Sequence, residues 1–126
     1  MLYVRDVMKK EIIAAKIHEP IQHISKVLTE KKISNMPVMD TRGRLIGVVS
    51  EQDIIRAMES ENFMKLTAKD IMTKTVRSVK ENDSLEYVSK IFVEHPFRRL
   101  PVTRNKKVVG AVTREDIINS FMSEYY

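Results

Sequence analysis

The sequence predicts an α/β fold built from two copies of one half-domain, each with the element order strand, helix, strand, strand, helix. The first observation is an internal repeat, because Asp6-Val7-Met8 recurs as Asp70-Ile71-Met72 at an offset of 64 residues. At the same offset Pro37-Val38 aligns with Pro101-Val102. The second is that apolar residues between these motifs follow helical spacing in both copies. The third is a motif, Gly-x-Val-Ser/Thr-x-x-Asp, that occurs once in each copy.

Each repeat begins with a short apolar segment that we expect to form a strand. The repeats are residues 1–64 and 65–126, and the strands are predicted near Ile12–Ala14 and Val76–Ser78. A half-domain of this size has a small sheet and little core of its own. We therefore expect the two halves to pack through their small sheets about a pseudo-twofold axis, which would leave two equivalent clefts.

A helix is predicted after each of these strands, over about Pro20–Lys32 and Ser84–Glu94. The apolar residues fall at positions 21, 24 and 28 in one helix and at 85, 88, 91 and 92 in the other, which is helical spacing. Asp83 with Glu86 three residues later predicts a capped start. Pro20 suits a first helical position.

A β-hairpin and a second helix complete each repeat. The hairpin strands are predicted at Met36–Met39, Arg44–Val49, Leu100–Thr103 and Val108–Val112. Between them Asp40-Thr41-Arg42-Gly43 becomes the shorter Arg104-Asn105-Lys106-Lys107, so the offset falls to 63 in a turn, where a length change is tolerated. The second helices begin after Ser50 and Thr113. Residues near Ser60–Thr67 join the copies.

The composition is that of a globular protein with an anionic partner or a solvated basic surface. Of 126 residues, 43% are hydrophobic and 31% are charged, with a net charge of +5. The Lys and Arg residues are scattered, which disfavours a nucleic-acid interface. The absence of cysteine excludes disulfides and thiolate sites. No signal-like or membrane-spanning segment is recognised, and we expect a cytoplasmic location.

The repeated Ser/Thr-x-x-Asp has two interpretations. Ser50 with Asp53, and Thr113 with Asp116, can each form a capping box at a strand-to-helix junction. The same geometry suits a nucleotide, because helix N-terminal amides attract anions and a carboxylate one turn in can accept ribose hydroxyls. A capping pair can also face a ligand, so both interpretations remain open.

The ordered set of motifs resembles a tandem pair of CBS domains, a family named for cystathionine β-synthase. It comprises Asp-x-Met, a short apolar strand, a helix, Pro-Val and Gly-x-Val-Ser/Thr-x-x-Asp, twice over about residues 4–122. The resemblance implies a regulatory module that holds AMP, ADP, ATP or sometimes S-adenosylmethionine in clefts between the repeats. It also implies a homodimer shaped as a flat four-lobed disc.

The resemblance implies roles for ten residues. Asp53 and Asp116 would bind ribose, and Ser50 and Thr113 would lie beside ribose or phosphate. The remaining six are the adenine-contacting Ile12, Ile13, Val76 and Arg77 and the phosphate-contacting Arg98 and Arg99. Arginine forms forked, charge-assisted bonds to phosphate, so the residue type fits. The first repeat has Ser34-Asn35 in place of the arginine pair, which predicts unequal clefts.

The sequence also bears on functions other than the sensing of an adenylate. The three histidines are too dispersed for a metal site, and we recognise neither a glycine-rich phosphate loop nor a nucleophile motif. We therefore expect no enzyme, no catalytic residue and no cofactor beyond the adenylate ligand, in a protein that senses energy state for an unidentified effector. The alternatives are a dimeric scaffold without nucleotide, an S-adenosylmethionine binder and a nucleic-acid binder.

Overall fold

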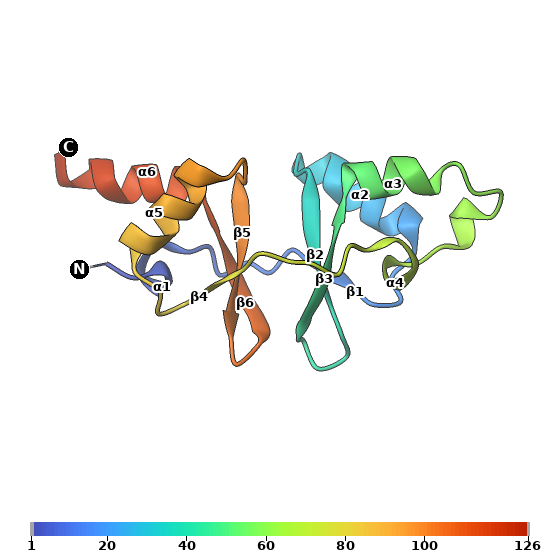
Figure 1. Ribbon diagram of the computed structural model, residues 1–126, viewed down its shortest axis with the longest axis horizontal. Coiled ribbons are helices and arrows are strands. Elements are labelled where there is room, and N and C mark those ends of the chain that lie inside the picture. The colour runs from blue at the N-terminus through green and yellow to red at the C-terminus, as the bar shows by residue number, and fades with distance from the viewer. Residues whose placement is uncertain (1, 126) are drawn as a thin grey trace. The chain divides into compact units, whose positions relative to one another are not determined.

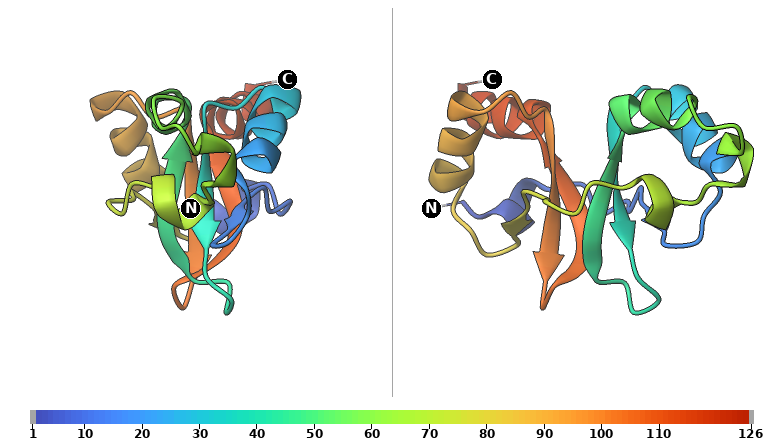
Figure 2. Two further views of the ribbon diagram at one scale, coloured as in Figure 1. Left: turned by 90° about the vertical axis from the view of Figure 1, so that its right-hand side faces the viewer. Right: turned by 45° about the vertical axis from the view of Figure 1, so that its right-hand side comes forward.

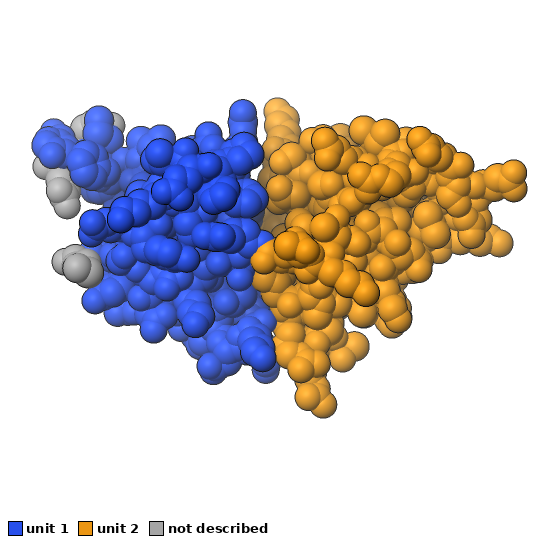
Figure 3. Space-filling model, viewed as in Figure 1, with its two compact units in different colours: residues 1–12, 77–126 blue, residues 13–76 orange. Residues whose placement is uncertain are grey.

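The computed structural model describes residues 2–125 and forms two compact units (Figures 1 and 3). Unit 2 is the continuous segment of residues 13–76. Unit 1 combines residues 1–12 with residues 77–126. The units are therefore displaced by about twelve residues from the sequence repeats 1–64 and 65–126, because the first residues of each repeat lie in the unit built mainly from the other repeat. Each unit contains one three-stranded sheet.

Unit 2 has a sheet in the order β1-β2-β3, in which β1 runs parallel to β2 and β2 pairs with β3 as an antiparallel hairpin. Helices α2 and α3 contact each other and lie on one side of this sheet (Figure 2). The elements in chain order are β1 (Ala15–Lys16), α2 (Ile21–Lys31), β2 (Asn35–Met39), β3 (Leu45–Ser50), α3 (Glu51–Ala57), the 3-10 helix η1 (Phe63–Lys65) and α4 (Ala68–Ile71).

Unit 1 repeats this plan with the sheet order β4-β5-β6, again with a parallel pair followed by an antiparallel hairpin. Its short helix α1 comes from the beginning of the chain and contacts α6. Its elements are α1 (Val4–Val7), β4 (Val79–Lys80), α5 (Leu85–Glu94), β5 (Arg99–Arg104), β6 (Lys107–Thr113), α6 (Arg114–Met122) and the 3-10 helix η2 (Ser123–Tyr125).

Each unit has its own apolar core. In unit 2, Ile24 and Leu28 of α2 pack on the buried positions of β2 and β3, as the helical spacing predicts. In unit 1, Val88 and Ile91 of α5 pack in the same way. The short helices add to the cores as well, because α1 buries Val4 in unit 1 and α4 buries Ala68 in unit 2. No helix within residues 2–125 has both the length and the apolar composition needed to cross a lipid bilayer.

The two hairpins confirm that the length change lies in a turn. The longer turn has Gly43 at φ 81° and Asp40, whose carboxylate accepts hydrogen bonds from the amides of Arg42 and Arg44, both at 2.9 Å. The shorter turn places Asn105 at φ 51° and Lys106 at φ 69°. Two consecutive residues with positive φ are typical of the tight two-residue hairpin turn, which explains the deletion.

The first strand of each repeat is not where the sequence predicts it. Ile12–Ala14 and Val76–Ser78 have no regular structure, and the strands begin at Ala15 and Val79. The ladder explains the shift, since Ala15 pairs with Val38 and Val79 with Val102, each in the second half of the neighbouring strand. A two-residue strand carries no alternation that would fix its register from the sequence.

The helix starts differ from the sequence prediction by one residue. Ser84, not Asp83, caps α5, because its Oγ accepts the amide of Tyr87 at 3.1 Å. The carboxylate of Asp83 instead accepts the amide of Lys80 at 2.8 Å and closes the preceding turn. Pro20 is the residue before the first helical position of α2. Such shifts are ordinary at helix ends, where several nearby side chains can satisfy the free amides.

The repeated Asp-x-Met motif forms a one-turn helix that the sequence interpretation left unassigned. Asp6 accepts the amide of Tyr3 at 2.7 Å, and Asp70 accepts the amide of Thr67 at 2.8 Å. These aspartates therefore cap α1 and α4. Thr67-Ala-Lys-Asp70 is itself a Ser/Thr-x-x-Asp motif, so a signal for α4 was present.

Candidate functional site

The predicted hydroxyl and carboxylate of the first repeat meet at the start of α3. Ser50 is the N-cap residue, and its Oγ accepts the amide of Asp53 at 3.1 Å. In return, Oδ2 of Asp53 accepts the Ser50 amide at 2.8 Å and the Ser50 hydroxyl at 3.0 Å. Oδ1 accepts from Arg56 at 3.2 Å and from the hydroxyl of Thr73 at 3.2 Å. The capping box predicted for this junction is therefore present, and Asp53 is buried.

The second repeat forms the same arrangement at the start of α6. Thr113 is the N-cap residue, and its Oγ1 accepts the amide of Asp116 at 3.1 Å, while Asp116 Oδ2 accepts the Thr113 amide at 2.8 Å. Oδ1 of Asp116 forms an ion pair with the ammonium of Lys9. The Asp116 side chain is 9% exposed and that of Lys9 is 50% exposed.

The glycine that opens each motif makes room for the chain segment following Asp-x-Met. Lys9 and Ala111 exchange backbone hydrogen bonds of 2.8 and 3.0 Å, so this segment lies directly on β6. A Cβ atom at Gly110 would lie 2.2 Å from the Lys9 carbonyl oxygen. Thr73 and Val48 exchange the equivalent bonds in unit 2, at 2.8 and 2.9 Å. The glycine therefore brings the side chain at position 9 or 73 to the carboxylate.

The two carboxylates differ in how many hydrogen-bond donors they already hold. A carboxylate offers about four lone-pair positions. Within residues 2–125, Asp53 accepts from four donors, namely the Ser50 amide, the Ser50 hydroxyl, Arg56 and Thr73. Asp116 accepts from two, the Thr113 amide and the Lys9 ammonium. Asp116 therefore retains capacity for a further pair of donors, such as two hydroxyls.

The predicted phosphate-binding arginines lie next to the Asp116 junction. Arg99 begins β5 and pairs with Thr113 in the ladder, and the carbonyl of Arg98 accepts the amide of Arg114 at 3.1 Å. Arg114 in turn fixes the preceding loop, because its Nε donates to the Phe97 carbonyl at 2.6 Å. Among the described residues, neither the Arg98 nor the Arg99 guanidinium has a hydrogen-bond or ion-pair partner. Both are consequently available to an anion.

The predicted adenine-contacting residues lie on the two segments where the chain passes from one unit to the other. Ile12 and Arg77 belong to unit 1 and are exposed, whereas Ile13 and Val76 belong to unit 2 and are half-buried. None lies in a strand. Their contact with adenine remains a prediction.

Two residues of these junctions, Lys9 and Thr73, were missed by the sequence interpretation. Both directly follow Asp-x-Met and align at the offset of 64, which was the available signal. Within the described chain, no group of three His, Asp or Glu side chains is placed to hold a metal ion.

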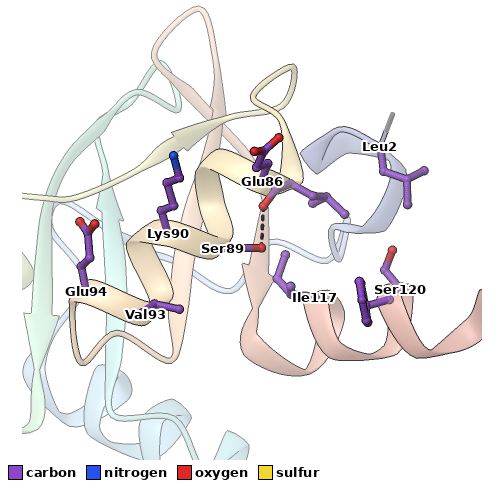
Figure 4. Close-up of a pocket in the computed structure, with 10 residues that line it drawn as sticks. Leu2, Glu86, Ser89, Lys90, Val93, Glu94, Ile117 and Ser120 are labelled. Carbon is purple, nitrogen blue, oxygen red and sulfur yellow. Dashed lines mark hydrogen bonds between the residues drawn. The ribbon is translucent and has the colours of Figure 1, made fainter.

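A separate apolar groove of about 610 Å³ lies in unit 1 between α5 and α6 (Figure 4). Val93, Ile117 and Phe121 line it together with Leu2, and Glu86 and Lys90 lie along its α5 side. None of the ten predicted site residues contributes to it.

Comparison with known proteins identifies both repeats. The family model described as CBS domain matches residues 4–60 and 68–123. The chain is 30% identical over 121 residues to the uncharacterised protein YlbB of Bacillus subtilis, a match that covers 93% of this chain and 80% of YlbB. It is also 30% identical over 119 residues to L-aspartate semialdehyde sulfurtransferase of Methanocaldococcus jannaschii. That match covers 94% of this chain and 23% of the larger protein.

Solved structures with the same fold include two complexes. CBSX2 of Arabidopsis thaliana, in complex with AMP, superposes with a TM-score of 0.86 at 26% identity over the full length of both chains. The CBS domain pair of protein MJ0100, in complex with 5′-methylthioadenosine and S-adenosyl-L-methionine, superposes with a TM-score of 0.77 at 29% identity, over 98% of each chain.

Proposed function

The chain belongs to the CBS domain family, and from that membership we propose that it is a regulatory module that binds an adenine nucleotide. One observation carries the proposal: the duplicated hydroxyl–carboxylate pair at the strand-to-helix junctions, with spare acceptor capacity on Asp116. The AMP complex of CBSX2, which superposes over the whole chain, supports the same ligand class.

The residues present fit an adenine nucleotide in unit 1. Asp116 can accept two ribose hydroxyls without losing its bond to the Thr113 amide. Arg98 and Arg99 supply forked donors for phosphate beside the same helix start. Asp53 in unit 2 would have to release Thr73 or Arg56 to accept ribose. We therefore propose that the Asp116 junction binds more tightly than the Asp53 junction.

S-adenosylmethionine is the second candidate ligand, supported by the complex of the MJ0100 domain pair. Both ligands share the adenosine moiety, so the ribose contacts are the same. The match to the sulfurtransferase covers only 23% of that enzyme's length, so its activity is not a ground for proposing catalysis by this chain. We propose instead that the chain regulates an unidentified effector. A cytoplasmic location and an energy-sensing role remain predictions.

We also propose a homodimer formed through the second helix of each repeat. Ile55 of α3 and Met58, the C-cap residue that follows α3, are 64% and 59% exposed, and the aligned Ile118 and Phe121 of α6 are 57% and 62% exposed. Apolar side chains at equivalent positions on both helices suit burial against a second copy. Light scattering should give the mass of two chains for the parent and of one chain for Phe121→Asp. A monomeric parent would exclude this assembly.

A thermal-shift screen of ligand-free protein against AMP, ADP, ATP and S-adenosylmethionine tests the ligand proposal. A ligand that binds only the folded state adds about 2.7 kcal/mol at a hundredfold excess over its Kd, which corresponds to a midpoint rise of about 8 °C. Asp116→Ala should abolish the part of the midpoint rise that comes from ligand bound at the Asp116 junction.

Asp83→Ala is the matched control for this substitution. Its carboxylate also accepts one backbone amide at 2.8 Å, as Asp116 does, but closes a turn before α5. We expect Asp83→Ala to lower the starting midpoint and leave the ligand response unchanged. Absence of any response in the folded parent would leave the Ser/Thr-x-x-Asp pairs as helix caps alone.

A further inference from the structure

Lys9 distinguishes the two junctions. Its ammonium pairs with Oδ1 of Asp116, whereas the aligned residue in the other repeat, Thr73, presents a neutral hydroxyl to Asp53 at 3.2 Å. Asp53 also has a cationic partner, Arg56 at 3.2 Å, but this guanidinium belongs to α3 itself and aligns with the neutral Asn119 of α6. The two carboxylates therefore receive their cation from different elements, and only Asp116 receives it from the segment that lies on the neighbouring strand.

The backbone fixes Lys9 at this place independently of its side chain. The two hydrogen bonds to Ala111 and the absence of a Cβ atom at Gly110 hold the segment on β6. The Lys9 side chain is nevertheless 50% exposed, so its ammonium faces both the buried carboxylate and solvent. Such a cation can interact with a ligand without first leaving Asp116, because an ammonium carries three donors.

The residues around Asp116 also carry a more positive net charge than the residues around Asp53. The unit 1 junction, defined as residues 9–10, 98–99, 113–116 and 119, holds five basic and two acidic residues, a net charge of +3. The aligned unit 2 junction, residues 73–74, 34–35, 50–53 and 56, holds two basic and two acidic residues, a net charge of zero. An anionic ligand is therefore favoured at the unit 1 junction and not at the unit 2 junction.

We propose that Lys9 is a specificity-determining residue that makes the Asp116 junction selective for phosphate-bearing adenosine ligands. This inference rests on the proposed function. The Lys9 ammonium offsets the carboxylate charge that would otherwise repel a phosphate, and Asp116 keeps its remaining lone pairs for ribose. At the Asp53 junction Arg56 already offsets the carboxylate and Thr73 stands in place of the lysine, so the net charge is zero and phosphate-bearing ligands are not favoured over adenosine.

Lys9→Thr tests the inference because it installs the residue that the protein itself uses at position 73. Calorimetric titration with AMP and with adenosine gives the ratio of their affinities for the parent and the variant. We expect the ratio of AMP to adenosine affinity to fall about tenfold in Lys9→Thr, as expected when one nearby charge is removed from a partly exposed site. The difference should shrink at high salt, where the charge is screened. Thr73→Lys should raise the ratio at the Asp53 junction.

Two further variants separate charge from packing. Lys9→Arg keeps the charge and should preserve the ratio, and Lys9→Gln keeps the chain length while removing the charge and should lower it as Lys9→Thr does. Lys9→Gln also serves if Lys9→Thr does not fold. If Lys9→Thr or Lys9→Gln folds, binds AMP and keeps the parent's ratio of AMP to adenosine affinity, the proposed role of Lys9 is wrong. The proposed function would stand in that case. A folded parent that binds neither AMP nor adenosine, and that responds to none of the ligands in the thermal-shift screen, would overturn the proposed function itself.

Discussion

Replacing Gly110 by alanine would test how residues 1–12 are held in unit 1. The new methyl group would lie 2.2 Å from the backbone carbonyl oxygen of Lys9, which cannot move without breaking both hydrogen bonds to Ala111. Overpacking costs about 1–3 kcal/mol. Losing two hydrogen bonds adds about 1 kcal/mol each. We expect Gly110→Ala to lower the free energy of unfolding by about 3–5 kcal/mol.

Gly47→Ala is the internal comparison, because Gly47 occupies the aligned position in unit 2. Its methyl group would lie 2.6 Å from the Met72 sulfur and 3.0 Å from the Thr73 carbonyl oxygen. The thioether can rotate away, so we expect a smaller cost of about 1–2 kcal/mol. Gly43→Ala controls for backbone conformation, since φ is 81° there and nothing lies within 4 Å. It should cost about 1 kcal/mol.

Urea unfolding followed by circular dichroism would measure the three variants against the parent. The order of destabilisation should be Gly110→Ala, then Gly47→Ala, then Gly43→Ala. If Gly110→Ala cost no more than Gly43→Ala, the segment around Lys9 would not lie on β6 as described, and the position of Lys9 beside Asp116 would lose its support.

Three further predictions concern stability. Ile24→Ala, at a side chain fully buried in unit 2, should cost about 2–5 kcal/mol by urea unfolding, whereas Val93→Ala, at a side chain 85% exposed, should change stability by less than about 0.5 kcal/mol. Thr113→Ala should cost about 1 kcal/mol in the same assay, since it removes the N-cap of α6. The hydrogen bond from the Thr67 amide lowers the pKa of Asp70 below its ordinary value of 3.8. Ionised Asp70 therefore stabilises the fold fully above pH 3.8, and this contribution is lost as the pH falls below that value. In a plot of urea midpoint against pH, Asp70→Asn should accordingly show a smaller decrease at acid pH than the parent.

The helices and hairpins were predictable because their signals are local. The spacing of Ile21, Ile24 and Leu28 fixes the buried face of α2 without reference to the rest of the chain. The hairpins follow from short apolar runs on either side of a turn. The junctions were likewise predictable as capping boxes, since Ser50 and Thr113 each meet a carboxylate three residues later.

The remaining features depend on contacts between distant parts of the chain. The register of β1 is set by its pairing with β2, and the two residues of Ala15–Lys16 carry no periodicity of their own. Helices α1 and α4 span one turn each, too short for a periodic signal. The role of Lys9 depends on the pairing of its segment with β6, about a hundred residues later. A repeat in the sequence indicates that equivalent segments pair in both copies, but it does not show which residues pair.

The division of unit 1 between both ends of the chain has a consequence for biosynthesis. All residues of unit 2 have been synthesised by position 76, whereas the partner of Lys9 in β6 is Ala111. Unit 2 can therefore fold while the ribosome is still translating unit 1, but Lys9 cannot pair with its partner until β6 has been synthesised. During that interval Val4 lacks the other residues of its core, and residues 2–12 are accessible to proteases and chaperones. A nonsense mutation in β6 would leave unit 2 with all of its core residues and unit 1 without the strand that residues 9–10 require.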